Sequence, residues 1–245
     1  MQPATSPHTP ARQRRKESRP GELLDAALDL FVEKGFANTR IEEVAARAGV
    51  SKGTLYLYFP SKEELLKAVI RHNLSLTIAE GDDLADNFQG STAELISMIT
   101  HGWWERVGKT QASGIFLIMM TEMRAFPALA EFYRDEVILP GQRLVGKILQ
   151  RGIDRGEFCQ VDVPVTAKSF IFPMLLLCMH KHSFNNCSMS DEPEDPQAFL
   201  ANHVELMVHG LRPRPRGDAA AFVAVPVAEP RAKSVSSSAP RKKTP

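Results

Sequence analysis

The first apolar residues of the chain recur with the period of an α-helix. Leu24, Ala27, Leu28 and Phe31 have the spacing of residues that share one helical face, and Gly35 follows where such a helix would end. The sequence shows no sustained alternation of polar and apolar positions, which is the pattern of a half-buried strand. These patterns predict an all-α fold.

Glycine and proline divide the rest of the sequence into further helical segments. Breaks are predicted where these residues gather, near 81–90, 108, 127, 156–164 and 191–196. The segments between the breaks carry helical periodicity and span 91–107, 112–125, 127–155, 165–184 and 196–211. Pro140 and Gly141 predict a kink or a split within the third of these segments.

The composition is that of a globular protein rather than a membrane or secreted one. The chain has 245 residues, of which 43% are hydrophobic and 24% charged, enough for a sizeable buried core. Its three cysteines include no C-x-x-C pair, which favours a reducing cytoplasm over a disulfide framework. Residues 1–16 lack the apolar core of a signal peptide, and the apolar run 170–179 is too short to cross a bilayer.

The formal net charge of +1 is a cancellation between regions of opposite sign. Residues 1–20 carry five basic residues and one acidic residue, and residues 212–245 carry eight basic and two acidic. The remaining part of the chain therefore has a net charge of −9. Because both ends are also rich in Pro, Ser, Thr and Ala, we expect a disordered basic arm at 1–16 and a disordered basic tail at 212–245.

Residues 39–64 are dense in signals for helix ends. Thr39-Arg40-Ile41-Glu42 is typical of a capping box, and the helix that it opens would end at Gly49. Ser51 offers a new N-cap two residues later, and Pro60 ends that second helix before another box at 61–64. Two helices joined by such a short turn predict a helix-turn-helix at about 40–59.

The second helix of this motif, about 52–58, has side chains suited to DNA. Leu55 and Phe59 can anchor this helix on the core, which leaves Lys52, Thr54, Tyr56 and Tyr58 projecting from it. Its backbone N–H groups and Lys52 can bind phosphates, and its hydroxyl groups can bond to base edges. The alternative is an ordinary surface helix whose tyrosines pack at the edge of a core. Spacing alone leaves both interpretations open.

Two stretches, GFANTRI at 35–41 and VAARAGVSKGTLYLYFPSKEELL at 44–66, resemble the TetR/AcrR family of bacterial transcriptional regulators. The resemblance covers about residues 17–77 and implies a DNA-binding domain there, with the helix at 52–58 as its recognition helix. Leu57 departs from the family pattern, which often has a polar or aromatic residue at that position. By position, the DNA contacts that the resemblance implies are Thr39, Arg40, Ser51, Lys52, Gly53, Thr54, Tyr56, Tyr58 and Lys62.

The resemblance also implies a bacterial cytoplasmic protein, found at the nucleoid when bound to duplex DNA. Family members often have a flexible arm that touches an adjacent minor groove, and the basic residues at 12–16 fit that role. A solvated arm without a defined contact is the alternative. The tail has the same two interpretations, non-specific DNA attachment or a solvated segment.

Residues 78–211 resemble the family's helical effector-binding and dimerisation domain only loosely. Met and aromatic side chains on three of the predicted helices can line a cavity for an apolar or aromatic small molecule, or can simply form core. The residues of this candidate effector pocket are Trp103, Trp104, Phe116, Met119, Met120, Met123, Phe126, Phe170 and Met174.

The last two predicted helices are expected to pair with their copies in a homodimer. Their candidate interface residues are Leu175, Leu176, Phe199, His203, Leu206 and Met207. Two-fold symmetry would present two recognition helices to a palindromic operator. The sequence thus predicts a ligand-released repressor; an activator, or a binding protein that keeps the fold without regulating DNA, is the alternative.

Metal, cofactor and catalytic roles are not expected. Cys178 and His182 lie four residues apart, but no second pair at zinc spacing accompanies them, and Cys187 and His180 do not supply one. The catalytic and nucleotide-binding motifs G-x-S-x-G, H-E-x-x-H, P-loop and G-x-G-x-x-G are missing from the sequence.

Overall fold

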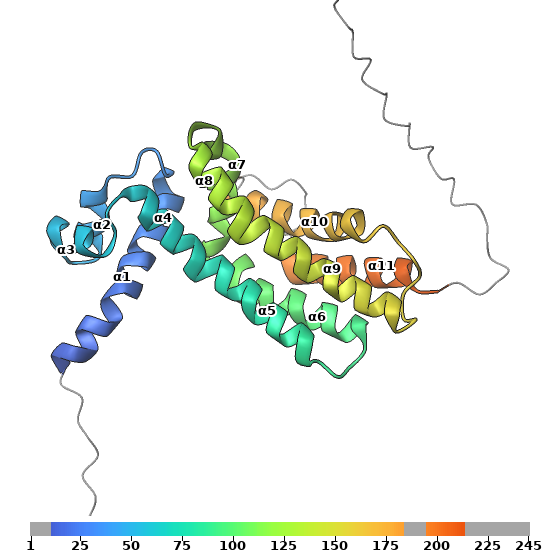
Figure 1. Cartoon of the computed structure of the whole chain (residues 1–245). Coiled ribbons are helices and arrows are strands. Elements are labelled where there is room, and N and C mark those ends of the chain that lie inside the picture. Colours follow the sequence, from blue (N-terminus) through green and yellow to red (C-terminus); the bar gives the residue numbers. More distant parts are fainter. Residues whose placement is uncertain (1–10, 184–194, 214–245) are drawn as a thin grey trace, which may run out of the picture. The chain divides into compact units, whose positions relative to one another are not determined.

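The structure, a computed structural model, describes residues 11–183 and 195–213, and within these ranges the regular elements are helices without a strand (Figure 1). The predicted all-α fold is confirmed. The helices are α1 (Ala11–Lys34), α2 (Ile41–Arg47), α3 (Lys52–Tyr58), α4 (Lys62–Ile70), α5 (Leu76–Asn87), α6 (Thr92–Trp103), α7 (Gly114–Glu122), α8 (Pro127–Tyr133), α9 (Leu139–Asp154), α10 (Val163–Ser183) and α11 (Pro196–Leu211).

Short helical turns of other types join several of these helices. The π-helical turns span Arg71–Ser75, Trp104–Gly108 and Arg134–Ile138, and the 3₁₀ turns span Gln111–Ser113 and Met123–Ala125. The first π-helical turn joins α4 to α5 with no non-helical residue between them, and the third joins α8 to α9 in the same way.

Helix α1 begins at Ala11, inside the region for which the sequence predicts a disordered arm. That prediction is wrong for residues 11–16, which are helical. The segment Ala-Arg-Gln-Arg-Arg-Lys consists of strong helix formers, and this propensity outweighs the charge that suggested disorder. Residues 1–10, and the tail from residue 214 onward, lie outside the described residues, so disorder there stays a prediction.

The apolar face predicted for the first helix forms the centre of the N-terminal core. Ala27 and Phe31 are fully buried, Leu24 and Leu28 nearly so, and this face packs against α2 and α4. Gly35 ends α1 with a φ of 81°, a left-handed conformation that favours glycine. These predictions from the sequence are confirmed.

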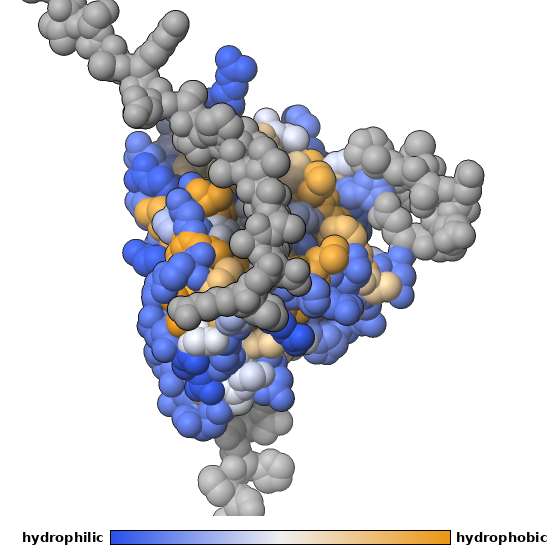
Figure 2. Space-filling view, turned by 90° about the vertical axis from the view of Figure 1, so that its right-hand side faces the viewer, coloured by the Kyte–Doolittle hydropathy of each residue, from blue (hydrophilic) through white to orange (hydrophobic). Residues whose placement is uncertain are grey.

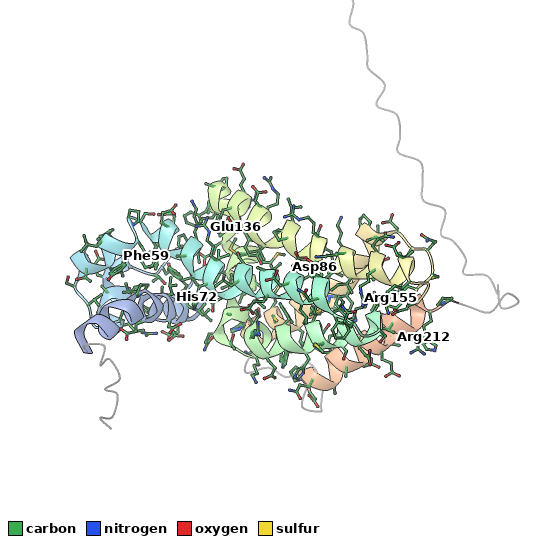
Figure 3. All side chains as sticks on the ribbon, turned by 60° about the horizontal axis from the view of Figure 1, so that its bottom comes forward. Phe59, His72, Asp86, Glu136, Arg155 and Arg212 are labelled. Carbon is green, nitrogen blue, oxygen red and sulfur yellow. The ribbon has the colours of Figure 1, made fainter. Side chains whose placement is uncertain are left out.

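In the larger half, the α4–α5 and α8–α9 helices lie side by side and run in the same direction (Figure 1). Near their beginnings the Ser75 hydroxyl donates to the carbonyl of Glu136 at 3.3 Å, and Figure 3 shows Glu136 and His72 on these two helices. Further along, Lys147 pairs with Asp86 at 2.6 Å. The pairing holds the two long helices in register along their length.

The break predicted near 81–90 begins only after Asn87, where α5 ends, and the kink or split predicted at Pro140 and Gly141 does not occur there. Gly81 lies within α5, where a Cβ would come within 2.9 Å of the Leu144 side chain, so this glycine allows close packing between α5 and α9. Pro140 stands in the first turn of α9, where its missing N–H has no partner in any case, and the helix continues through it. The irregularity in that helix lies earlier, in the π-helical turn at Arg134–Ile138.

Helix α10 is long and apolar enough to cross a membrane by length and composition alone. Its buried residues, which include Ala167, Phe170 and Met174, face α7 and α9, and basic residues occupy its last turn. The helix therefore serves as a packing element of the C-terminal half, with one side left to solvent. Residues 184–194, including Cys187 and part of a predicted break, lie outside the described residues.

Candidate nucleic-acid interface and effector region

The turn between α2 and α3 has the geometry that the sequence predicts. Gly49 adopts a φ of 66°, and Ser51 caps α3 by accepting the N–H of Thr54 at 3.1 Å. The two hydroxyl groups of this pair also bond to each other at 2.9 Å. Leu55 is fully buried and fixes α3 against the core. The capping bonds in the turn and the burial of Leu55 together fix the position of α3 in the helix-turn-helix.

Helix α2 begins one residue later than predicted, so Thr39 is not its N-cap. The Thr39 side chain is 2% exposed, and its hydroxyl donates to the carbonyls of Leu30 and Gly35 at 3.1 and 2.7 Å. Arg40 is the N-cap instead, and Glu43 accepts its backbone N–H at 3.2 Å. The Thr39 hydroxyl is thus bonded within the fold, and a phosphate contact by this residue stays a prediction.

Lys62 likewise acts inside the fold in this structure. Its ammonium donates to the carbonyls of Phe36, Ala37 and Thr39 at 2.8, 3.1 and 3.0 Å, and it lies 4.6 Å from the centre of the Phe36 ring. An ammonium has three N–H donors, so these three bonds leave none for a phosphate. The side chain thus stabilises the turn between α1 and α2, and a phosphate contact by Lys62 stays a prediction.

Glu122 also stabilises this turn, through the backbone N–H groups of the turn. Its carboxylate, at the end of α7, accepts the backbone N–H groups of Phe36 and Ala37 at 2.8 and 2.6 Å. The sequence does not single out Glu122, since its only signal is an acid that ends an apolar segment. Together with Lys62 it satisfies both the donors and the acceptors of this turn.

The outward side of α3 consists of Lys52, Gly53, Tyr56 and Leu57, all exposed. These residues form one contiguous arc of the helix at 100° per residue. Thr54 and Tyr58, also predicted contacts, are half-buried beside Leu55. Of the predicted recognition set, Lys52, Gly53 and Tyr56 therefore face solvent most fully, and Leu57 joins them.

Between residues 20 and 70, four of the six basic side chains have acidic partners. Their ion pairs are Lys34–Glu43 at 2.8 Å, Arg47–Glu33 at 2.6 Å, Lys52–Glu42 at 2.5 Å and Lys67–Glu64 at 2.7 Å. The hydrogen bond with Glu42 raises the pKa of Lys52, and the same bond lowers the pKa of Glu42. Arg40 is exposed, and its guanidinium has no hydrogen bond or ion pair within the described residues, which leaves it available to a phosphate.

Comparisons with known proteins identify the family. The sequence profile described as "Bacterial regulatory proteins, tetR family" matches residues 23–69. The HTH-type transcriptional regulator YfiR of Bacillus subtilis is 30% identical over 193 residues, which cover 78% of this chain and 90% of that protein. The chain belongs to the tetR family. This TetR-family chain is a DNA-binding transcriptional regulator.

Other relatives and solved structures agree with this assignment. The fatty acid metabolism regulator protein of Bacillus subtilis is 24% identical over 199 residues, covering 80% of this chain and 98% of that protein. The fatty acid degradation regulator FadR of Bacillus halodurans superposes with a TM-score of 0.66 at 20% identity, over 80% of this chain and 97% of that one. These relatives are regulators rather than enzymes.

The predicted effector-pocket residues of the TetR-family chain do not line one cavity. Trp104, Phe116, Met119, Phe170 and Met174 are buried in the core; Trp103, Met123 and Phe126 are half-buried against it; and Met120 is 71% exposed. The placement of Met120 contradicts its prediction. The sequence pattern shows which apolar residues lie on the same helix, but it does not show which of them line a cavity.

A hollow in the described residues lies between α6 and α11. This α6–α11 groove has a volume of about 530 Å³. Its lining residues are Ala93, Ser97, Thr100, His101, Trp104, Gln197, Leu200, Ala201, Val204, Glu205, Val208, His209 and Arg212. Figure 3 shows Arg212 at the end of α11. Trp104 is the one member of the predicted pocket set that borders the groove.

A second, small cavity of about 20 Å³ lies nearby, with apolar walls that include Phe170 and Met207. Thr100 borders both the groove and this cavity. Its hydroxyl oxygen is buried and has no hydrogen-bond partner within the described residues. Burying a hydroxyl group without a hydrogen-bond partner costs free energy. A ligand atom that bonds to this hydroxyl would therefore stabilise the complex.

Helices α10 and α11 leave large apolar side chains to solvent. On α10, Val165, Phe172 and Leu176 are 57%, 59% and 66% exposed, and on α11 Phe199 and Leu206 are 43% and 64% exposed. Figure 2 shows hydrophobic surface gathered in patches among hydrophilic surroundings on one face. An exposed apolar surface of this kind is typical of an interaction site.

The remaining predicted interface residues are less exposed. Leu175, His203 and Met207 are half-buried, and His203 bonds through Nε2 to the carbonyl of Phe170 at 2.9 Å. Leu176, Phe199 and Leu206 are the predicted members that face outward. Phe172 and Val165 join them, although the sequence analysis did not assign these two residues to the interface.

Cys178 is a buried thiol, and His182 is hydrogen-bonded to a serine. Burial raises the pKa of the Cys178 thiol to about 12, which keeps it protonated. His182 bonds through Nε2 to the Ser113 hydroxyl at 2.7 Å. Within 11–183 and 195–213, no group of three or more His, Cys, Asp or Glu side chains is placed to hold a metal ion.

Proposed function

We propose that this regulator acts as a homodimer that binds a palindromic operator and represses transcription until a small molecule releases it. The apolar outward face of α10 and α11 is the observation that supports the dimer. Phe172, Leu176 and Leu206 are each more than half exposed, and a second copy of the same face would cover them.

A dimer also supplies what one recognition helix lacks. Helix α3 has seven residues, few of which can reach base edges. Two copies related by a two-fold axis contact two half-sites about one helical turn apart, roughly 34–36 Å. The operator of this regulator would then be an inverted repeat. Like its bacterial relatives, the protein would work in the cytoplasm.

The α6–α11 groove is where we place the effector. Its volume of about 530 Å³ lies within the range of about 300–1,000 Å³ typical of small-molecule sites. Trp104, Leu200 and Val204 give it apolar walls for an apolar or aromatic ligand, and Thr100 offers a hydroxyl. One related structure, FadR of Bacillus subtilis, was solved in complex with stearoyl-CoA, so acyl compounds belong among the first ligands to test.

The DNA half of the proposal is tested by selecting duplexes from a random library with the full chain. We expect an enriched inverted repeat and a dimer by analytical ultracentrifugation. Leu176→Glu and Leu206→Glu place charges on the exposed face and should give monomers that lose operator affinity. Leu76→Glu, at a residue 55% exposed on α5, is the matched control and should stay dimeric. The proposal would be contradicted if the wild-type protein were a monomer and selected asymmetric duplexes that contain a single site.

The effector half is tested by tryptophan fluorescence, since the chain has only two tryptophans. A ligand in the groove, with stearoyl-CoA as the first probe, should change the emission of wild type and release the operator. Trp104→Phe should lose most of the emission change, because the remaining Trp103 does not line the groove. Release that accompanies an unaltered emission change in Trp104→Phe would place the effector elsewhere.

A further inference from the structure

The N-terminal region leaves large apolar side chains exposed only on α3. Among the side chains described between residues 20 and 70, Tyr56 is 41% exposed and Leu57 is 85% exposed, and the other large hydrophobic residues are more buried. The two residues are adjacent on the recognition helix. The apolar surface of this region is therefore concentrated at the place where DNA is read.

Packing does not account for a leucine at position 57. Leu55 is fully buried and Tyr58 is half-buried against the core, so the apolar anchor of α3 lies on the opposite side of the helix. Leu57 is also absent from the core cluster and from the residues packed against it. A polar side chain would serve the fold equally well at this position.

The neighbours of Leu57 leave room for a base to approach. Gly53 lies one turn earlier on the same side, and a Cβ there would meet only the Ser51 hydroxyl, at 3.8 Å. Thr54, the other neighbour one turn back, has its hydroxyl bonded to Ser51. Leu57 thus projects beyond its surroundings, with only methyl groups at its tip.

The chemistry of the major groove limits what such a side chain can recognise. Donors and acceptors mark every base pair there, but the 5-methyl group of thymine is the apolar feature. Leu57 has no donor or acceptor, so its contact can distinguish only the presence or absence of that methyl group. Lys52 and Tyr56, on the same arc, supply the polar contacts.

We infer that Leu57 recognises the 5-methyl group of one thymine in each half of the operator. This assignment rests on the proposed binding of α3 to DNA and adds a specificity-determining contact to it. Burial of one methyl group corresponds to about a fourfold change in affinity.

The test uses the duplex that wild type enriches from a random library. Each thymine is replaced in turn by deoxyuridine, which removes the 5-methyl group and keeps the pairing edge. We expect about a fourfold loss of wild-type affinity at one position in each half-site. Leu57→Ala should bind the thymine and deoxyuridine duplexes equally at that position. Because Leu57 is exposed, the variant should keep the wild-type melting temperature.

Two control variants separate this contact from general effects. Tyr56→Phe should keep the deoxyuridine penalty, and Leu76→Ala should behave as wild type throughout. Equal wild-type affinity for every deoxyuridine duplex, or an unchanged penalty in Leu57→Ala, would overturn the assignment alone. Failure of wild type to enrich any duplex would instead overturn the proposed DNA function, and the assignment with it.

Discussion

The carboxylate of Glu122 in α7 accepts the backbone N–H of Phe36 at 2.8 Å, which ties the C-terminal half of the chain to the turn after α1. The same carboxylate accepts the N–H of Ala37, and the Phe126 ring meets the Phe36 ring edge-on at 5.0 Å between centres. A Cβ on Gly35 would come within 2.7 Å of the Glu122 carboxylate, so a glycine at this position also makes room for the contact. The link joins the two halves through one side-chain carboxylate, two backbone N–H groups and a pair of rings.

We expect Glu122→Gln to lower the free energy of unfolding by about 1–2 kcal/mol, because an amide cannot accept with both of its terminal atoms. Urea denaturation of the full chain measures this change. Glu131→Gln, at an exposed residue of α8, is the control and should stay within about 0.5 kcal/mol of wild type. Equal losses in the two variants would contradict a specific role for Glu122.

Lys62→Met should destabilise the protein by about 2 kcal/mol, since three carbonyls of the turn lose a charged donor. Lys67→Met removes the same charge from the same helix but breaks only a part-buried pair with Glu64 and a contact with the Phe132 ring, so it should cost less than Lys62→Met. Thermal melts compare the two variants. A Lys62→Met protein with wild-type stability and weakened DNA binding would favour the phosphate contact over this structural role.

Arg40→Ala should weaken binding to all sequences and reduce its salt dependence. Each lost phosphate contact lowers the slope of log affinity against log salt by about 0.9, or about 1.8 for a dimer. Arg47→Ala is the matched control, because Arg47 is already paired with Glu33 and should leave the slope close to that of wild type. Fluorescence anisotropy on the selected duplex at several salt concentrations gives both slopes. Equal slopes in all three proteins would exclude the Arg40 contact.

Glu42→Gln should strengthen DNA binding by about twofold to fivefold, because the carboxylate competes with phosphate for Lys52. Glu63→Gln makes the same charge change on α4, away from Lys52, and should give a smaller gain. The measurement is operator affinity at fixed low salt. Gains of the same size in both variants would show a general charge effect rather than release of Lys52.

The protein should lose stability in mild acid through His182. Burial lowers the pKa of His182 below its usual 6.5, and nearby Lys181 lowers it further. The folded state therefore binds the proton less readily than the unfolded state, so this contribution is complete above pH 6.5 and decreases as the pH falls toward the lowered value. Melting temperatures of wild type and His182→Asn between pH 8 and pH 5 measure it, and the variant should show the shallower decrease.

Local signals in the sequence predicted the helix-turn-helix well, because its features depend on residues a few positions apart. Gly35, Gly49 and Ser51 end or begin helices as expected from conformational preference and side-chain capping. Thr39 was placed wrongly by one residue. Its hydroxyl bonds to the carbonyl of Leu30, nine residues away, and a capping motif cannot reveal that partner.

Contacts between distant segments account for the other differences. Gly81 marks close packing against Leu144 rather than a helix end, and Lys62 bonds to carbonyls 23 to 26 residues earlier in the chain. Met120 and Met119 are neighbours of the same type, yet one faces solvent and the other the core. Only the three-dimensional arrangement of α7 distinguishes them.

Helix α4, the π-helical turn after it and α5 make one continuous rod of 26 residues, from Lys62 to Asn87. At 1.5 Å per residue the rod is roughly 39 Å long. One end packs on α1 beside the recognition helix and the other on α9. A tilt of about 5° at the α9 end would move the far end by about 3 Å, close to the roughly 3.4 Å between base pairs. Because α4 packs on α1, which in turn packs on α2 and so leads to α3, a tilt of this size transmitted through these contacts would displace α3 by about one base pair.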